Sequence, residues 1–97
     1  MATTPLDGDE ISAALADLPG WRYDDNRLKK SFRFKNFREA MSFIVRLGFE
    51  AEKAGHHPEL FNVYATVDVA LTTHDAGNNV SRKDVGLARA IEQFVWV

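Results

Sequence analysis

Apolar residues recur at helical spacing in three stretches of the chain, and each stretch begins with a residue pair that has the spacing of a capping box. These pairs are Asp7 with Glu10, Asn36 with Glu39, and Ser81 with Asp84. The first helix is predicted to end before Pro19-Gly20 and the second near Gly55, whereas the third continues to the C-terminus. The side chains expected to face the core are Ile11, Ala14, Leu15 and Leu18, then Phe37, Ala40, Met41, Ile44, Leu47 and Ala51, then Val85, Ala88, Ile91 and Val95.

Between the helices, runs rich in β-branched and aromatic residues predict two hairpins. The first pairs residues 21–23 with residues 28–34 across a turn at residues 24–26. The run from Leu60 to Thr73 is longer than a typical strand, so we divide it into two strands that turn near Ala65-Thr66. The element order αββαββα predicts an α+β fold, with a four-stranded antiparallel sheet and helices packed on one face.

Length and composition then limit the classes of function. The 97 residues fit a single domain over residues 1–97, and so short a chain buries only about two-thirds of its unfolded surface, which favours self-association. A net charge of −2 argues against direct nucleic-acid binding. The absence of cysteine excludes disulfides, cysteine-bound zinc and thiol nucleophiles. No signal-peptide pattern or membrane-spanning apolar run is present, so we expect a cytoplasmic protein without membrane contact.

The three histidines provide the candidate chemistry, because all lie between positions 56 and 74 and two are adjacent in Gly55-His56-His57-Pro58. If the second hairpin turns through a two-residue loop at Ala65-Thr66, paired positions sum to 131 and His57 lies opposite His74. Opposed residues on antiparallel strands have Cβ atoms about 5 Å apart, so the three rings are expected to share a small ligand. The acidic residues that could orient an imidazole are Glu52, Asp75 and Asp84.

Each of these residues also has a purely structural explanation. Without His74, the adjacent histidines would fit a solvated helix-to-strand junction, where the helix dipole favours histidine. Gly55 is expected to end its helix, and Asp84 fits a capping role as well as a ligand role. Glu52 is expected to face solvent, while Phe61 and Tyr64 are expected to pack in the sheet.

The spacing of these residues matches a known signature. Glu52 is followed at fixed intervals by His56-His57-Pro58, Tyr64, His74 and Asp84. The segments Leu18-Pro19-Gly20-Trp21, Phe32-Arg33-Phe34 and Phe61-Asn62-Val63-Tyr64 extend the match over nearly the whole chain. In these features the sequence resembles the pterin-4a-carbinolamine dehydratases. It departs from them at Gly55, where relatives carry an acid, and in the loop Gly77-Asn78-Asn79, which is one residue longer than in animal members.

The resemblance implies dehydration of a 4a-hydroxytetrahydropterin to a quinonoid dihydropterin, the recycling step after aromatic amino-acid hydroxylation, with no metal or redox cofactor. An aromatic amino-acid hydroxylase is the implied partner in that pathway. The implied catalytic residues are His56, His57 and His74, and we expect His56 and His74 to carry protons while His57 positions the substrate. The implied substrate contacts are Gly55, Thr72, Thr73 and Asp75 together with these histidines, and the supporting residues are Glu52 and Asp84.

Two other functions remain to be considered. Three imidazoles could hold a catalytic divalent metal, although the HExxH spacing of zinc hydrolases is absent. Animal members of the resembling family also stabilise dimeric transcription factors through a helix, and Leu87, Ile91 and Phe94 could supply such a surface. The resemblance further implies homodimers joined through the sheet, or homotetramers. An edge strand or the exposed face of the last helix could form the contact between copies.

Overall fold

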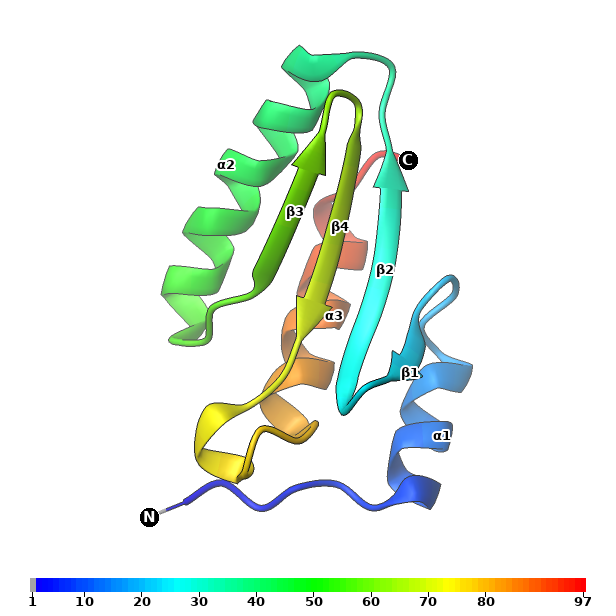
Figure 1. The fold of residues 1–97 in the computed structure, drawn as a ribbon, viewed down its shortest axis with the longest axis vertical. Coiled ribbons are helices and arrows are strands. Elements are labelled where there is room, and N and C mark those ends of the chain that lie inside the picture. The colour runs from blue at the N-terminus through cyan, green and yellow to red at the C-terminus, as the bar shows by residue number, and fades with distance from the viewer. Residues whose placement is uncertain (1) are drawn as a thin grey trace.

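The computed structural model describes residues 2–97 and confirms the predicted α+β fold with the element order αββαββα (Figure 1). The elements are α1 (Gly8–Ala16), β1 (Arg22–Asp24), β2 (Arg27–Arg33), α2 (Phe37–Ala54), β3 (Glu59–Val63), β4 (Thr66–Leu71), the short 3₁₀ turn η1 (His74–Ala76) and α3 (Arg82–Phe94). The predicted capping residues Asp7, Asn36 and Ser81 each precede a helix. Among these residues, no helix has the length and apolar character that a membrane crossing requires.

The sheet has the strand order β1-β2-β4-β3, and all neighbouring strands are antiparallel. Side chains alternate between its two faces, so Phe32 of β2 and Val67 of β4 are buried on the same side. Helices α2 and α3 contact this side and each other, and Figure 1 shows α3 passing behind the sheet. The core therefore lies between one face of the sheet and the helices, while the opposite face remains open.

The second hairpin differs from the prediction in its register. Val63 pairs with Thr66 and Glu59 with Ala70, so the turn is Tyr64-Ala65, one residue earlier than expected. Tyr64 has a positive φ of 48°, and the Asn62 side-chain amide donates hydrogen bonds to the carbonyl oxygens of Tyr64 and Thr66. Tyrosine rarely adopts this conformation, so its residue type does not signal the turn. The predicted pairing of His57 with His74 is wrong, because neither residue lies in a strand.

The buried face of α2 also differs from the prediction. Phe37 and Met41 were expected in the core but are 47% and 37% exposed, whereas Phe43 is fully buried. The Phe43 ring lies 4.9 Å from Phe32 and 5.0 Å from Phe34, measured between ring centroids. Apolar residues occupy more than one side of this helix, so their spacing alone does not identify the side that meets the sheet.

Smaller differences occur at the ends of elements. β1 and β2 are shifted by one residue from the predicted strands, a common uncertainty at element boundaries. Leu18 is buried as expected, although α1 already ends at Ala16. In α3, Leu87 is buried in addition to the predicted core residues Val85, Ala88 and Ile91.

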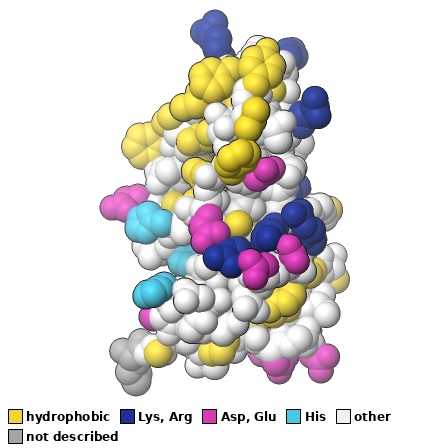
Figure 2. Space-filling model, in the orientation of Figure 1, with side chains coloured by type: hydrophobic (Ala, Val, Ile, Leu, Met, Phe, Trp, Pro, Cys, Tyr) yellow, Lys and Arg dark blue, Asp and Glu magenta, His cyan; other side chains and the backbone are white. Residues whose placement is uncertain are grey.

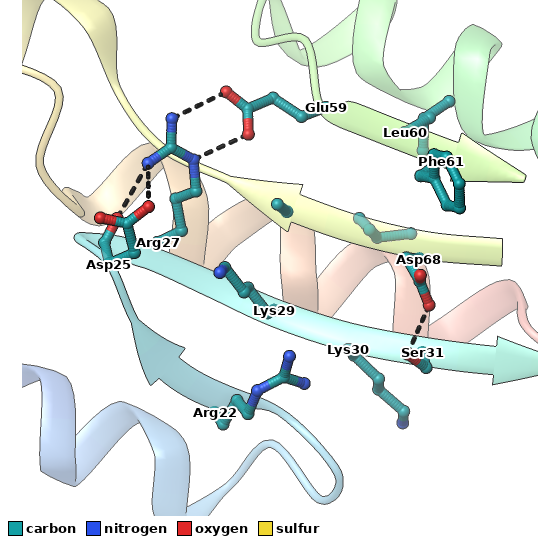
Figure 3. Close-up of a pocket in the computed structure, with 12 residues that line it drawn as sticks. Arg22, Asp25, Arg27, Lys29, Lys30, Ser31, Glu59, Leu60, Phe61 and Asp68 are labelled. Carbon is teal, nitrogen blue, oxygen red and sulfur yellow. Dashed lines mark hydrogen bonds and ion pairs between the residues drawn. The ribbon is translucent and has the colours of Figure 1, made fainter.

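The open face of the sheet contains a hollow of about 460 Å³ (Figure 3). Its floor includes Ala70 of β4, whose small side chain lies between Lys29 of β2 and Glu59 of β3. Figure 3 shows Arg27 reaching across β4 to Glu59, with Nε–Oε1 and Nη2–Oε2 distances of 2.7 and 3.1 Å. This hydrogen-bonded pairing lowers the pKa of the Glu59 carboxyl and raises the pKa of Arg27. A single ion pair with two hydrogen bonds thus connects strands β2 and β3 across the hollow.

We expect Phe43→Ala to lower the free energy of unfolding by about 3–5 kcal/mol, because it removes a fully buried ring and leaves a cavity. Phe37→Ala on the same helix should change it by less than about 1 kcal/mol, since that ring is half exposed. Urea denaturation followed by circular dichroism measures both values. Equal decreases in the free energy of unfolding for the two variants would contradict the observed orientation of α2.

We expect Glu59→Gln to lower the free energy of unfolding at neutral pH by less than about 1 kcal/mol, the usual range for an exposed ion pair. Because Arg27 lowers the pKa of Glu59 in the folded state, this stabilisation is present above the unfolded-state pKa. It is lost as the pH falls through the folded-state pKa. Urea denaturation should therefore show the two proteins converging below about pH 4, and a pH-independent difference would refute the explanation.

Candidate active site

The adjacent histidines follow directly from the way α2 ends. Gly55 caps the helix in the left-handed conformation, with φ 64° and ψ 30°, which glycine adopts without steric cost. The backbone N–H of Gly55 donates to the carbonyl of Glu52, and that of His56 donates to the carbonyl of Ala51. This pattern is a Schellman motif, so the expected role of Gly55 as a helix-ending residue is confirmed. The motif ends α2 and places His56 and His57 at the beginning of the connection to β3.

His56 is buried and contacts the carboxylate of Asp84 with an Nε2–Oδ1 distance of 2.5 Å. Asp84 is fully buried near the start of α3. Its Oδ2 accepts hydrogen bonds from the Ser81 backbone N–H at 2.8 Å and from the Thr73 hydroxyl at 2.7 Å. Asp84 therefore has the predicted capping role, and it also contacts one of the predicted catalytic histidines; its expected ligand role stays a prediction.

The second ring nitrogen of His56, Nδ1, is not fully buried. Within residues 2–97, Nδ1 makes no hydrogen bond, and no buried side-chain nitrogen or oxygen atom is without a partner. Nδ1 must therefore be accessible even though most of the ring is buried. Since ionised Asp84 can only accept, a neutral His56 donates through Nε2–H and presents an unprotonated Nδ1 outward.

His57 lies on the surface beside Glu52. Its Nε2 is 2.8 Å from Glu52 Oε1, and the two side chains are 67% and 79% exposed. Glu52 faces solvent as expected and also holds the His57 ring from the last turn of α2. This pair is exposed to solvent, unlike the buried pair of His56 and Asp84.

His74 begins the short turn η1, and Thr72 and Thr73 separate it from the end of β4 at Leu71. Its Nδ1 lies 3.2 Å from Asn78 Oδ1, and Asn78 has a positive φ of 59°. Asp75 is exposed, with one carboxylate oxygen 3.8 Å from Lys83 Nζ. Asn78 was not predicted as a partner of His74, although residues four positions apart can make contact across one turn.

Two further predicted substrate contacts use their hydroxyl groups within the protein. Thr72 donates to the backbone carbonyl of Asn26 at 3.0 Å. Thr73 is 2% exposed, and its Oγ1 lies 2.6 Å from Ser81 Oγ in addition to its bond with Asp84. The sequence identified Ser81 only as a helix cap, so this buried pair of hydroxyl groups is visible only in the structure.

Figure 2 shows the histidine side chains close together on one face of the molecule. None of the three lines the hollow on the open face of the sheet. Within the described chain, no three His, Cys, Asp or Glu side chains are grouped as metal ligands, an arrangement that the three-histidine metal hypothesis requires. The candidate site is therefore built from three imidazoles whose partners are Asp84, Glu52 and Asn78.

Other predicted surface and core positions are corrected by the structure. Phe61 and Tyr64 were expected to pack in the sheet but are 63% and 66% exposed, because Phe61 faces the open side and Tyr64 lies in the turn. Leu87 and Ile91 are buried, and Phe94 packs against the core. These last three residues therefore do not form the exposed helix surface considered for a protein partner.

The fold and sequence are shared with known proteins. The family model described as pterin 4 alpha carbinolamine dehydratase matches residues 4–94. Relatives from Opitutus terrae and from Prochlorococcus marinus, whose names refer to the same dehydratase, are 53% and 47% identical; the matches cover 91% of each chain in the first case and 94% in the second.

A crystal structure shows the same similarity in three dimensions. The transcriptional coactivator/pterin dehydratase from Brucella melitensis is 39% identical, with a TM-score of 0.87 over 93% of this chain and 97% of that chain. The family model, the sequence identities and the shared fold each extend over nearly the whole chain. They lead to the same family as the spacing of the three histidines. The chain therefore belongs to the pterin-4a-carbinolamine dehydratase family, a family of hydro-lyases.

Proposed function

We propose that this protein dehydrates a 4a-hydroxytetrahydropterin to a quinonoid dihydropterin by histidine acid/base catalysis. Membership of the family supports the dehydratase reaction and the pterin substrate. The observation that carries the catalytic part of the proposal is the contact between His56 and buried Asp84. This contact holds one nitrogen of a largely buried imidazole and leaves the other nitrogen accessible to solvent.

The reaction requires two proton movements. An acid gives a proton to the 4a-hydroxyl, the C4a–O bond breaks, and its electron pair leaves with the oxygen as water. A base takes the proton from ring N5, and the N–H electron pair forms the N5–C4a double bond. Imidazole suits both tasks because its ordinary pKa lies near neutral pH.

The three histidines have different surroundings that suit different roles. We assign the proton transfers to His56, whose Nε2 is held by the buried carboxylate of Asp84, and to His74, whose Nδ1 contacts Asn78. His57 positions the pterin, since its exposed pairing with Glu52 can adjust as the substrate binds. Gly55, Thr72 and Asp75 lie beside these histidines in sequence and supply further substrate contacts.

Self-association is part of the proposal, as a homodimer or homotetramer. Its support is the exposed apolar surface on elements at the edge of the fold. Phe61 and Val63 lie on β3, which is an edge strand, and Val45 and Phe49 lie on α2. An edge strand and an exposed apolar helix side both favour contact with a second chain.

Replacement of the histidines tests the catalytic assignment. We expect His56→Ala, His57→Ala or His74→Ala to lower kcat/KM on the order of a hundredfold or more for at least one position, the usual scale for a positioned acid or base. The assay generates the 4a-hydroxypterin in situ and follows quinonoid formation spectroscopically. Arg22→Ala in the hollow on the open face is the control and should retain activity. Unchanged rates in all three histidine variants would reject histidine catalysis.

Metal removal tests the competing three-histidine hypothesis. Elimination of water from a carbinolamine needs only the two proton transfers, so we expect full turnover after treatment with a chelator and gel filtration. The same dehydration assay measures the rate before and after treatment. Loss of activity that added Zn²⁺ restores would instead establish a metal-dependent reaction.

A further inference from the structure

We propose that Thr73 is a positioning residue for His56, acting through a directed chain of hydrogen bonds that ends at Asp84. These hydrogen bonds join the start of α3 to the end of α2 through Thr73, which lies two residues after the end of β4. The effect of this chain on turnover rests on the proposed function. Its effect on the His56 ring is independent of that function and can be measured separately.

Only one assignment of donors and acceptors is consistent with this series of hydrogen bonds. The Lys83 backbone N–H donates to Ser81 Oγ at 3.1 Å. Thr73 has one hydroxyl proton, which it donates to the Asp84 carboxylate, so the 2.6 Å contact between the hydroxyl oxygens requires Ser81 to donate to Thr73. The proton on His56 Nε2 completes the chain by donating to Asp84 Oδ1.

The Thr73 hydroxyl determines how the Asp84 carboxylate is oriented. Oδ2 receives two donors, the Ser81 N–H and the Thr73 hydroxyl, while Oδ1 is left for His56. Charge-assisted hydrogen bonds of this kind are short and strongly directional. Without the Thr73 hydroxyl, the buried Ser81 hydroxyl loses its acceptor, and Asp84 Oδ2 loses one of its two donors.

The orientation of Asp84 in turn selects the His56 tautomer. A carboxylate can only accept, so it stabilises the tautomer that has its proton on Nε2 and leaves Nδ1 bare toward solvent. If Asp84 rotates or takes up a proton, the opposite tautomer becomes accessible and Nδ1 no longer accepts a proton. Thr73 thereby controls whether the exposed nitrogen of His56 can act as a base.

Thr73 also lies directly before His74. Its backbone N–H donates to the carbonyl of Asn79, and it forms an isolated antiparallel bridge with that residue. The bridge closes the loop that contains His74 and Asn78. The same residue therefore anchors the loop of one proposed proton carrier through its backbone and orients the other through its side chain.

Nitrogen NMR of ¹⁵N-histidine-labelled protein tests the tautomer at about pH 8.5, where an ordinary imidazole is neutral. His57→Gln and His74→Gln assign the three rings. We expect wild-type His56 to show a protonated Nε2 and a bare Nδ1, and Thr73→Val to show a mixture of tautomers. Thr73→Ser, which keeps the hydroxyl, should restore the wild-type pattern. A fully retained Nε2–H tautomer in Thr73→Val would overturn the proposal.

A measurement on the wild-type protein keeps the test decisive if Thr73→Val does not fold. The Thr73 hydroxyl proton should exchange slowly with water and give a resolved proton signal, because the group is buried and donates to a carboxylate. Thr66, half-buried on β4 and without a side-chain hydrogen bond among the described residues, is the internal comparison. Equally fast exchange of the Thr73 and Thr66 hydroxyl protons would contradict the proposed series of hydrogen bonds.

Dehydratase kinetics separate a positioning role from direct substrate contact. We expect Thr73→Val to lower kcat about tenfold, the effect of losing one charge-assisted hydrogen bond, with KM changed less than about twofold. Thr73→Ser should recover the rate, and the control Thr66→Val should match the wild type. A raised KM with unchanged kcat would mean that Thr73 binds substrate instead. Absence of turnover in the wild type would reject the proposed function but leave the NMR test of Thr73 intact.

Discussion

A single buried carboxylate constrains much of this structure. Asp84 has no solvent exposure, and a charge removed from water costs several kcal/mol unless hydrogen bonds replace its hydration. Its donors come from three separate parts of the chain: His56 after α2, Thr73 after β4, and Ser81 before α3. The hydrogen bonds to the Asp84 carboxylate therefore fix the end of α2, the segment after β4 and the start of α3 relative to each other.

The same contact makes the three histidines chemically unequal. His56 is held in a buried setting that leaves one nitrogen accessible, whereas His57 and His74 are exposed and paired with Glu52 and Asn78. A reaction that moves two protons benefits from this difference, because each imidazole can be adapted to a separate task. The helix cap at Ser81 and the candidate active site thus share the side chain of Asp84.

Local sequence signals predicted the elements well and the contacts between them less well. Ser81 and Asp84 mark the start of α3 because a capping box is complete within four residues. The buried side of α2 could not be predicted from the spacing of apolar residues, because Phe37 and Met41 are also apolar. In the structure, Phe43 is the aromatic residue of this helix that packs against Phe32 and Phe34. The turn at Tyr64-Ala65 was also missed, because the Asn62 side chain stabilises a conformation that tyrosine rarely adopts.

By itself, the sequence determined the order of helices and strands, the caps that begin them, and the residue types of the site, because these depend on neighbours a few residues apart. It also carried the spacing of histidines and acids that identifies the family. Only the tertiary structure decided that His56 meets Asp84, 28 positions away, and that Thr73 lies between Asp84 and Ser81. Such contacts depend on how the whole sheet and two helices pack, and no local preference encodes that distance.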